Sequence, residues 1–321
     1  LVGRGFAAGK RRRNRQVDQR VVDVVRVEQR RHRCTAIAVA GAVGAHQPLG
    51  QRPVETTVAA RPVTVLQQGG EVLVHVDDDP AAAPRVDAQI RVGGDAGASE
   101  VVVLHARGAA ASNQESLITG LLLPDAPVVA WWPTDSPDVP ADSPIGRIAQ
   151  RRITDASTKP DPAGWLAELG AKYRPGDTDF AWTRVTRWRE QLAAVLDQPP
   201  FTPVLSAEVR GAADSPSTTL LAAWLRLKLD VPVAHHFLSP EEGAIGIQSV
   251  RLHRAVGDIV LERPVPAHAI LTQPGQPTHD LSFPRRTLRE CLAEELRRLD
   301  PDVLYGRVIT EGLELLHESA T

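Results

Sequence analysis

Residues 121–155 read LLLPDAPVVAWWPTDSPDVPADSPIGRIAQRRITD, and this stretch decides how the rest of the chain is interpreted. The apolar run at 127–132 is typical of a central strand in an α/β sheet, because such strands are buried on both faces. Four prolines then disfavour both helix and strand pairing. A short helix at 145–150 and a second strand at 151–154 are predicted to follow. Two adjacent tryptophans and an arginine pair indicate either a binding surface or a buried joint.

On the N-terminal side, the sequence predicts antiparallel strands. VDAQIRV (86–92) alternates at period 2, GGDAG is a turn, and SEVVVLHA (99–106) is a second strand. GGDAG could instead bind phosphate, but it lacks the GxGxxG spacing. Ser112 or Asn113 caps a helix that ends before Pro124. These elements predict a small α/β domain with a mixed sheet over residues 81–158.

On the C-terminal side, Asp161 and Pro162 begin a helix that follows a predicted linker at 156–162. The remaining pattern predicts helices at 178–196 and 216–229, with strands at 203–210 and 232–237. Alternating runs at 245–253, 257–263, 268–273 and 279–283 predict an antiparallel sheet, and helices follow at 287–298 and 301–316. Residues 159–321 are therefore expected to form a second α/β or α+β domain, which places the chain in the α/β class.

Residues 1–80 differ from the rest of the chain. The first 40 residues carry eleven Lys and Arg against three acidic residues, although the formal net charge of all 321 residues is only −2. Their apolar residues follow no settled helical or strand period. Three interpretations stay open: a disordered basic arm, a diverged domain, or a translated segment never selected to fold. The segment 64–76 can be read as a hairpin around Gly69 and Gly70.

No catalytic signature is found in the sequence. It has no nucleophile elbow, HExxH motif, phosphate-binding Walker loop or CxxC pair. His235 and His236 are adjacent in a predicted strand, so they point to opposite faces and cannot easily share a metal. Cys34 and Cys291 are far apart and are expected to be thiols in a reducing cytoplasm. No run of 18 apolar residues predicts a membrane span. We therefore expect a cytoplasmic protein without catalytic residues, metal or cofactor.

Tryptophan and arginine supply the candidate binding residues. All six tryptophans fall between residues 131 and 224, and arginines lie beside several of them. Trp and Arg dominate the energetic centres of protein interfaces. The alternatives are a core helix with solvated arginines, or a phosphate site built on the arginines. The candidate partner-binding residues are Trp131, Trp132, Arg151, Arg152, Asp155, Trp182, Arg184, Trp188 and Arg189.

Several long motifs in order resemble the OpcA family of glucose-6-phosphate dehydrogenase assembly proteins, in its actinobacterial form. They are RVDAQIRVGGDAGASEVVVL, LLLPDAPVVAWWP, RRITD, GDTDFAWTRVTRWREQLAAVLDQPP and PRRTLRECLAEELRRLDPD. The resemblance covers residues 84–316. It implies a non-enzymatic protein that binds glucose-6-phosphate dehydrogenase, promotes its active oligomer and supports NADPH supply through the oxidative pentose phosphate pathway. It implies no nucleic-acid or membrane partner.

The resemblance leaves an alternative from another class, a sugar-phosphate- or nucleotide-binding module that uses the clustered arginines. Redox control through cysteines is not carried over, because Cys34 lies in the atypical segment and Cys291 in a predicted helix. The role of residues 121–155 is also undecided. Trp131 and Trp132 favour a joint that holds the first domain together, whereas Arg151 and Arg152 favour a surface for a partner.

Overall fold

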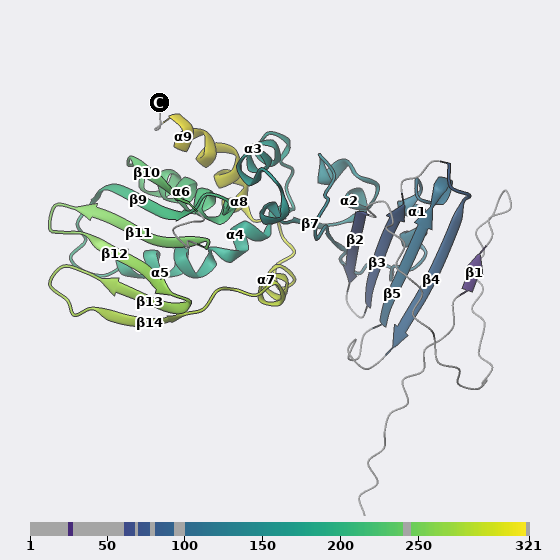
Figure 1. Ribbon diagram of the computed structural model, residues 1–321, viewed down its shortest axis with the longest axis horizontal. Coiled ribbons are helices and arrows are strands. Elements are labelled where there is room, and N and C mark those ends of the chain that lie inside the picture. Colours follow the sequence, from purple (N-terminus) through teal and green to yellow (C-terminus); the bar gives the residue numbers. More distant parts are fainter. Residues whose placement is uncertain are drawn as a thin grey trace, which may run out of the picture.

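A computed structural model describes residues 25–27, 61–67, 70–77, 81–92, 100–239 and 245–318. These residues build two sheets with associated helices, one in each lobe of an elongated molecule (Figure 1). Both sheets are mixed, so the predicted α/β class is confirmed. Cys34 and most of the atypical N-terminal segment lie outside the described residues. No described helix has the length and apolar character that crossing a membrane requires.

The first sheet has eight strands in the order β1-β4-β5-β3-β2-β6-β7-β8. Their bounds are β1 Val25–Val27, β2 Arg61–Gln67, β3 Gly70–Asp77, β4 Arg85–Val92, β5 Glu100–Arg107, β6 Val129–Trp131, β7 Arg151–Thr154 and β8 Asp177–Asp179. The predicted hairpins β2–β3 and β4–β5 are both antiparallel pairs. Strands from the atypical segment and from beyond residue 159 therefore contribute to this sheet, and the domain limits at 81 and 159 stay predictions.

The core of the first lobe lies between the sheet and two short helices, α1 (Gln114–Thr119) and α2 (Pro144–Ile148). Alternate residues of β2 and β3, such as Val65 and Val74, point into it, as the period of two in a strand requires. Each helix begins at a polar cap: the side chain of Asn113 accepts from the amide of Ser116, and that of Ser143 from the amide of Gly146. Trp132 is buried in this core.

The second sheet has six strands in the order β10-β9-β11-β12-β13-β14. Their bounds are β9 Val204–Ala212, β10 Val233–Leu238, β11 Ile247–Arg254, β12 Ile259–Val265, β13 Ala267–Thr272 and β14 His279–Phe283. β9 and β10 run parallel because α6 (Pro216–Leu229) crosses between them, and the other neighbours are antiparallel. This is the antiparallel sheet that the alternating runs predict, extended by one parallel strand pair.

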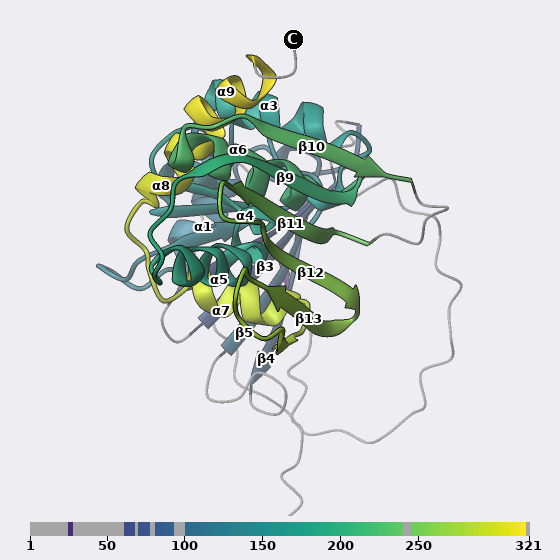
Figure 2. The same cartoon turned by 90° about the vertical axis from the view of Figure 1, so that its left-hand side faces the viewer.

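Helices pack on one face of the second sheet, and Figure 2 shows α5 and α6 behind its strands. The helices of this lobe are α3 (Pro162–Lys172), α4 (Phe180–Arg184), α5 (Thr186–Leu196), α6, α7 (Leu288–Glu295), α8 (Val303–Arg307) and α9 (Leu313–Glu318), with a π-helical turn at Val308–Gly312. Of these, α6 packs on β9 and β10, whereas α3, α4 and α9 pack on α6, and α7 packs on α4. The predicted cap of α3 is confirmed, since the side chain of Asp161 accepts from the amide of Gly164. In β9, Ala207 and Val209 are buried against this layer, whereas Arg210 is exposed.

Two predicted segments differ from the structure. The single helix expected at 178–196 is instead β8 followed by α4 and α5, because Asp179 lies in a strand and its carboxylate caps α4 through the amide of Ala181. The linker expected at 156–162 contains a 3-10 turn at Ala156–Thr158, which Asp155 caps and in which Ala156 is fully buried. Both differences place buried acidic side chains at the border between the two lobes.

Candidate functional site

The C-terminal end of the stretch 121–155 forms a buried joint between the lobes, built on β7. β7 pairs in parallel with β6 on one side and with β8 on the other. All four residues of β7 are buried. We call the polar network around this strand the β7 joint and define it by Arg151, Arg152, Thr154, Asp155, Asp177, Asp179, Thr183, Arg184 and Glu295.

Arg151 connects β7 to the C-terminal helix α7. Its side chain is about as buried as a charged group can be, with 3% of the residue exposed, and Glu295 is 4% exposed. Arg151 donates from Nε to Glu295 Oε2 at 2.7 Å, and from Nη2 to the same oxygen. Its Nη1 donates to the carbonyl of Asp300 at 2.8 Å. The other carboxylate oxygen of Glu295 accepts from the hydroxyl of Thr183 at 2.5 Å. The pair is therefore fully hydrogen-bonded, which is the condition under which a buried ion pair persists.

Arg152 closes the opposite side of the joint. Its Nε donates to Asp177 Oδ1, its Nη1 to the carbonyl of Ala149 at 2.8 Å, and its Nη2 to the carbonyl of Pro175. Gly176, with φ +98°, makes this possible: a Cβ there would lie 2.4 Å from the carbonyl oxygen of Gln150. Because its donors are used internally, Arg152 has none directed at a ligand.

Asp155 and Arg184 form a bidentate salt bridge. Arg184 Nη1 donates to Oδ1 at 2.7 Å and Nη2 to Oδ2 at 2.6 Å, the fork geometry that makes arginine–carboxylate pairs strong. Asp155 is buried, whereas Arg184 keeps about a quarter of its side chain exposed. The same carboxylate caps the 3-10 turn through the amide of Ser157 at 3.1 Å.

Asp179 lies at the centre of the joint and is fully buried. Its carboxylate accepts from the amides of Ala181 and Ala156, at 2.8 and 2.9 Å, and from the hydroxyl of Thr154 at 2.6 Å. Burial and the neighbouring charge of Asp155 nevertheless raise the pKa of Asp179 to about 6. The joint therefore contains a carboxyl group that titrates in the mildly acidic range.

The tryptophans pack inside the protein around this joint. Trp131 contacts Phe180 edge to face at 5.7 Å. Trp182 donates from its indole to Asp302 at 2.8 Å, and the guanidinium of Arg189 lies 3.7 Å above its ring. Trp188 is buried against Phe283. This is how large aromatic side chains pack in a protein core.

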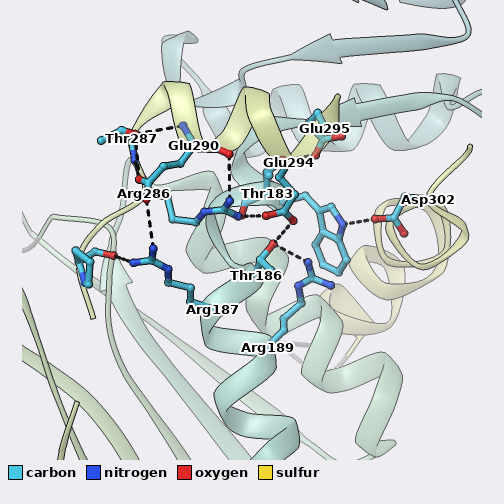
Figure 3. Close-up of polar contacts among 12 residues, drawn as sticks. Thr183, Thr186, Arg187, Arg189, Arg286, Thr287, Glu290, Glu294, Glu295 and Asp302 are labelled. Atoms are coloured by element: carbon cyan, nitrogen blue, oxygen red, sulfur yellow. Dashed lines mark hydrogen bonds and ion pairs between the residues drawn. The ribbon is translucent and has the colours of Figure 1, made fainter. Parts of the chain in front are cut away.

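Helices α4 and α5 are tied to α7 by a second polar layer (Figure 3). Thr186 donates to Glu294 at 2.9 Å, and Arg286 donates to the carbonyl of Thr183 at 2.8 Å and to Glu294. Figure 3 also shows Arg187 from α5 reaching toward the segment before α7, where its Nη1 meets the carbonyl of Pro284 at 3.0 Å.

Of the nine candidate partner-binding residues, the structure buries six and leaves three partly exposed. The buried ones are Trp132, Arg151, Arg152, Asp155, Trp182 and Trp188, and the partly exposed ones are Trp131, Arg184 and Arg189. Arg151 and Arg152, which the sequence favoured as a surface, are joint residues. The sequence pattern gave no indication of Glu295 or Asp177 as partners in the joint, or of Asp302 as the acceptor of the Trp182 indole. A polar residue before a helix could have indicated the capping role of Asp302.

Two histidines of the second sheet pair with carboxylates. His253 lies between Glu208 and Asp258, each at 3.1 Å, and His268 contacts Asp280 at 3.2 Å. Within the described part of the chain, no group of three or more potential ligands could hold a metal ion. Cys291 is a buried free thiol whose pKa is raised, chiefly by burial.

Comparison with known families places both lobes. Residues 61–171 match the family described as the N-terminal domain of the glucose-6-phosphate dehydrogenase subunit, and residues 175–309 match the family described as its C-terminal domain. The chain belongs to this OpcA family. The two domains follow one another here in the expected order, and the β7 joint lies across the point where one match ends and the other begins.

Other comparisons add little. No curated protein matches the chain. A solved structure of a 3-ketoreductase from Actinomadura kijaniata, with NADP and TDP-benzene, shares 12% identity and a TM-score of 0.31. That match covers 53% of this chain and 67% of the reductase.

Proposed function

We propose that this OpcA-family chain binds glucose-6-phosphate dehydrogenase, favours its active oligomer and catalyses no reaction of its own. The observation that carries the proposal is the pair of family matches, which together extend from residue 61 to residue 309 and are both described as parts of a dehydrogenase subunit. A cytoplasmic location is part of the proposal and agrees with the free thiol of Cys291.

The joint supplies a physical route for this function. An effector shifts an equilibrium only by its different affinity for the two states. A tenfold activation needs a preference of about 1.4 kcal/mol. A rigid binding surface keeps this difference in binding free energy, because the surface cannot adjust its shape to fit both states of the partner equally well. Arg151–Glu295 links β7 of the first sheet to α7 of the second lobe, and this link would let contacts made by either lobe bear on the same partner.

We propose that direct contact falls to the candidates that keep exposed surface, Trp131, Arg184 and Arg189. The six buried candidates then act on the partner only by holding the lobes in place. Arg189 is the sharpest of the three to test, because its pKa is lowered, chiefly by burial, and a partner's carboxylate beside it would reverse that effect.

The proposal is tested by mixing the purified chain with its cognate dehydrogenase. We expect a higher rate at fixed substrate and a larger particle by light scattering. Arg189→Gln should weaken the complex, with a modest fall in the unfolding midpoint because the guanidinium no longer stacks on Trp182. Arg307→Gln is the matched control, because Arg307 is half exposed and pairs with Glu311 one helical turn away. If neither rate nor mass changes on mixing, the proposed function is wrong.

A further inference from the structure

A basic pocket lies at the start of α6 and adjoins the β7 joint, because Arg184 contributes to its lining. Its volume is about 340 Å³, near the lower end of small-molecule pockets. Ser215, Pro216 and Ser217 line one side, Gly246 and Ile247 another, and Pro284 a third. Of the four arginines from which the sequence suggested a phosphate site, Arg184 lines this pocket, whereas Arg151, Arg152 and Arg189 do not.

Among the residues that the structure describes, five arginines line the pocket against one carboxylate, that of the exposed Asp214: Arg184, Arg187, Arg263, Arg285 and Arg286. Three of the five are already paired, Arg184 with Asp155, Arg286 with Glu294 and Arg187 with Glu290. The other two, Arg263 and Arg285, make no ion pair with any described residue. The pocket therefore keeps an excess of positive charge.

Arg263 is held in an unfavourable position. Its Nε is buried without a hydrogen-bond partner among the described residues. Its guanidinium lies 5.0 Å from the ring centre of Trp188 and 5.3 Å from that of Phe283. Burial, and then the charges of Arg285 and Arg187, lower its pKa to about 10. Sites that break local rules of charge pairing without an internal compensation are frequently functional.

The backbone around the pocket adds to the positive potential. α6 is 14 residues long and has no acidic residue in its first turn. The side chain of its N-cap residue, Ser215, accepts no hydrogen bond from the first amides of the helix, so the positive end of the helix dipole has no side-chain cap. The helix follows the carboxyl end of β9, which pairs with the parallel β10 and the antiparallel β11. Open α/β sheets bind ligands outside the carboxyl ends of their strands.

Gly246 keeps this region open. With φ +61°, it adopts a conformation that favours glycine, and a Cβ there would lie 3.1 Å from Arg285 Nη1. β11 also carries a register shift between Ile247 and Ser249, beside the pocket, and such bulges occur frequently next to binding sites. Arg285 donates from Nη2 to the carbonyl of Ile245, and its Nη1 faces the space that the missing Cβ leaves free.

We propose that this pocket binds the phosphate group of a small phosphorylated molecule. Guanidinium forks and a helix N-terminus are the donors that phosphate oxygens prefer. The rings of Trp188 and Phe283 are covered, so they offer no open face on which a nucleotide base could stack. The volume of the pocket suits a small polar molecule that carries one phosphate group. Arg263 and Arg285 contact the phosphate, and Arg187 contributes charge.

The test uses the full chain and isothermal titration calorimetry with two probes, inorganic phosphate and glycerol 3-phosphate, with glycerol as the uncharged control. We expect both phosphates to bind and to raise the melting temperature, because a ligand that binds only the folded state stabilises it. Arg263→Gln and Arg285→Gln should each weaken binding by at least about tenfold, since each removes a charged hydrogen-bond donor. Arg307→Gln removes the same charge outside the pocket and should bind as the unchanged chain does.

Three results would overturn the proposal. The first is that neither phosphate binds at concentrations up to about 10 mM, which is far above the dissociation constant of a useful binding site. The second is equal binding by Arg263→Gln and the unchanged chain. The third is binding of a short poly-aspartate peptide that phosphate fails to displace, which would assign the pocket to an acidic protein segment. The dehydrogenase is absent from this experiment, so its outcome is independent of the proposed assembly function.

Discussion

Removal of the Glu295 carboxylate tests whether the β7 joint holds the lobes together. In Glu295→Ala, the Arg151 guanidinium stays buried, with 3% of the residue exposed, and loses the acceptor of two of its hydrogen bonds. The hydroxyl of Thr183 loses its acceptor as well. Breaking a buried pair by removing one partner costs about 3–5 kcal/mol, because the remaining charge stays desolvated. That cost is a large fraction of the roughly 5–15 kcal/mol that stabilises a typical domain.

The assay is urea unfolding followed by tryptophan fluorescence, because Trp182 and Trp188 are buried close to the joint. The matched control is Glu311→Ala, which removes a carboxylate from an exposed pair with Arg307 and should cost only about 0.5 kcal/mol. A second comparison replaces both charges, Arg151→Met with Glu295→Leu. This double variant should be much more stable than Glu295→Ala, since no unpaired charge is left inside.

The reasoning would be refuted if Glu295→Ala lost no more stability than Glu311→Ala. It would also fail if the double variant were less stable than Glu295→Ala, because the cost would then arise from lost packing. Either result would mean that the lobes are held by their apolar contacts, and that Arg151 could turn outward to a partner.

Three further predictions concern the same region. The pKa of Asp179 is raised from 3.8 to about 6, so between these pH values the folded state holds a proton that the unfolded chain has lost. The free energy of unfolding should therefore fall by up to about 3 kcal/mol as pH rises from about 4 to about 6. Asp179→Asn should remove this slope in urea titrations at several pH values. Asp302→Ala leaves the Trp182 indole without its acceptor and removes the cap of α8, so stability should drop by about 2–3 kcal/mol, with a red shift of the native fluorescence. Gly176→Ala, at φ +98°, should reduce the free energy of unfolding by at least about 2 kcal/mol and lower the melting temperature measured by calorimetry. An unchanged melting temperature would show that Arg152 and the Gln150 carbonyl can move aside.

Local signals in the sequence predicted much of the fold. Asp161 and Pro162 begin α3, and the helix predicted at 216–229 agrees with α6, because capping and helical periodicity depend on residues a few positions apart. The antiparallel pairing of β4 and β5 follows equally from alternating runs on either side of a glycine-rich segment, which itself lies outside the described residues. The same reasoning failed at 178–196, where the side chain of Asp179 is taken up by three donors from β7, α4 and the 3-10 turn.

The joint itself could not be predicted, because its pairs are remote in sequence. Arg151 and Glu295 are 144 positions apart, and nothing in the spacing of either residue identifies the other. An arginine pair next to a buried strand has the same composition whether it faces a partner or a neighbouring helix. Burial decides between these possibilities, and burial depends on how α7 folds back over β7.

Strand β8 has a consequence for how such a gene can be divided. β8 lies in the segment that matches the C-terminal family, yet it hydrogen-bonds to β7, which lies in the segment that matches the N-terminal one. A gene cut between the two matches would encode one product with an open sheet edge and a buried arginine lacking its counter-ion, and another with a stray strand. The two halves are therefore expected to be inherited together, and neither should serve as a module that is recombined freely with unrelated proteins.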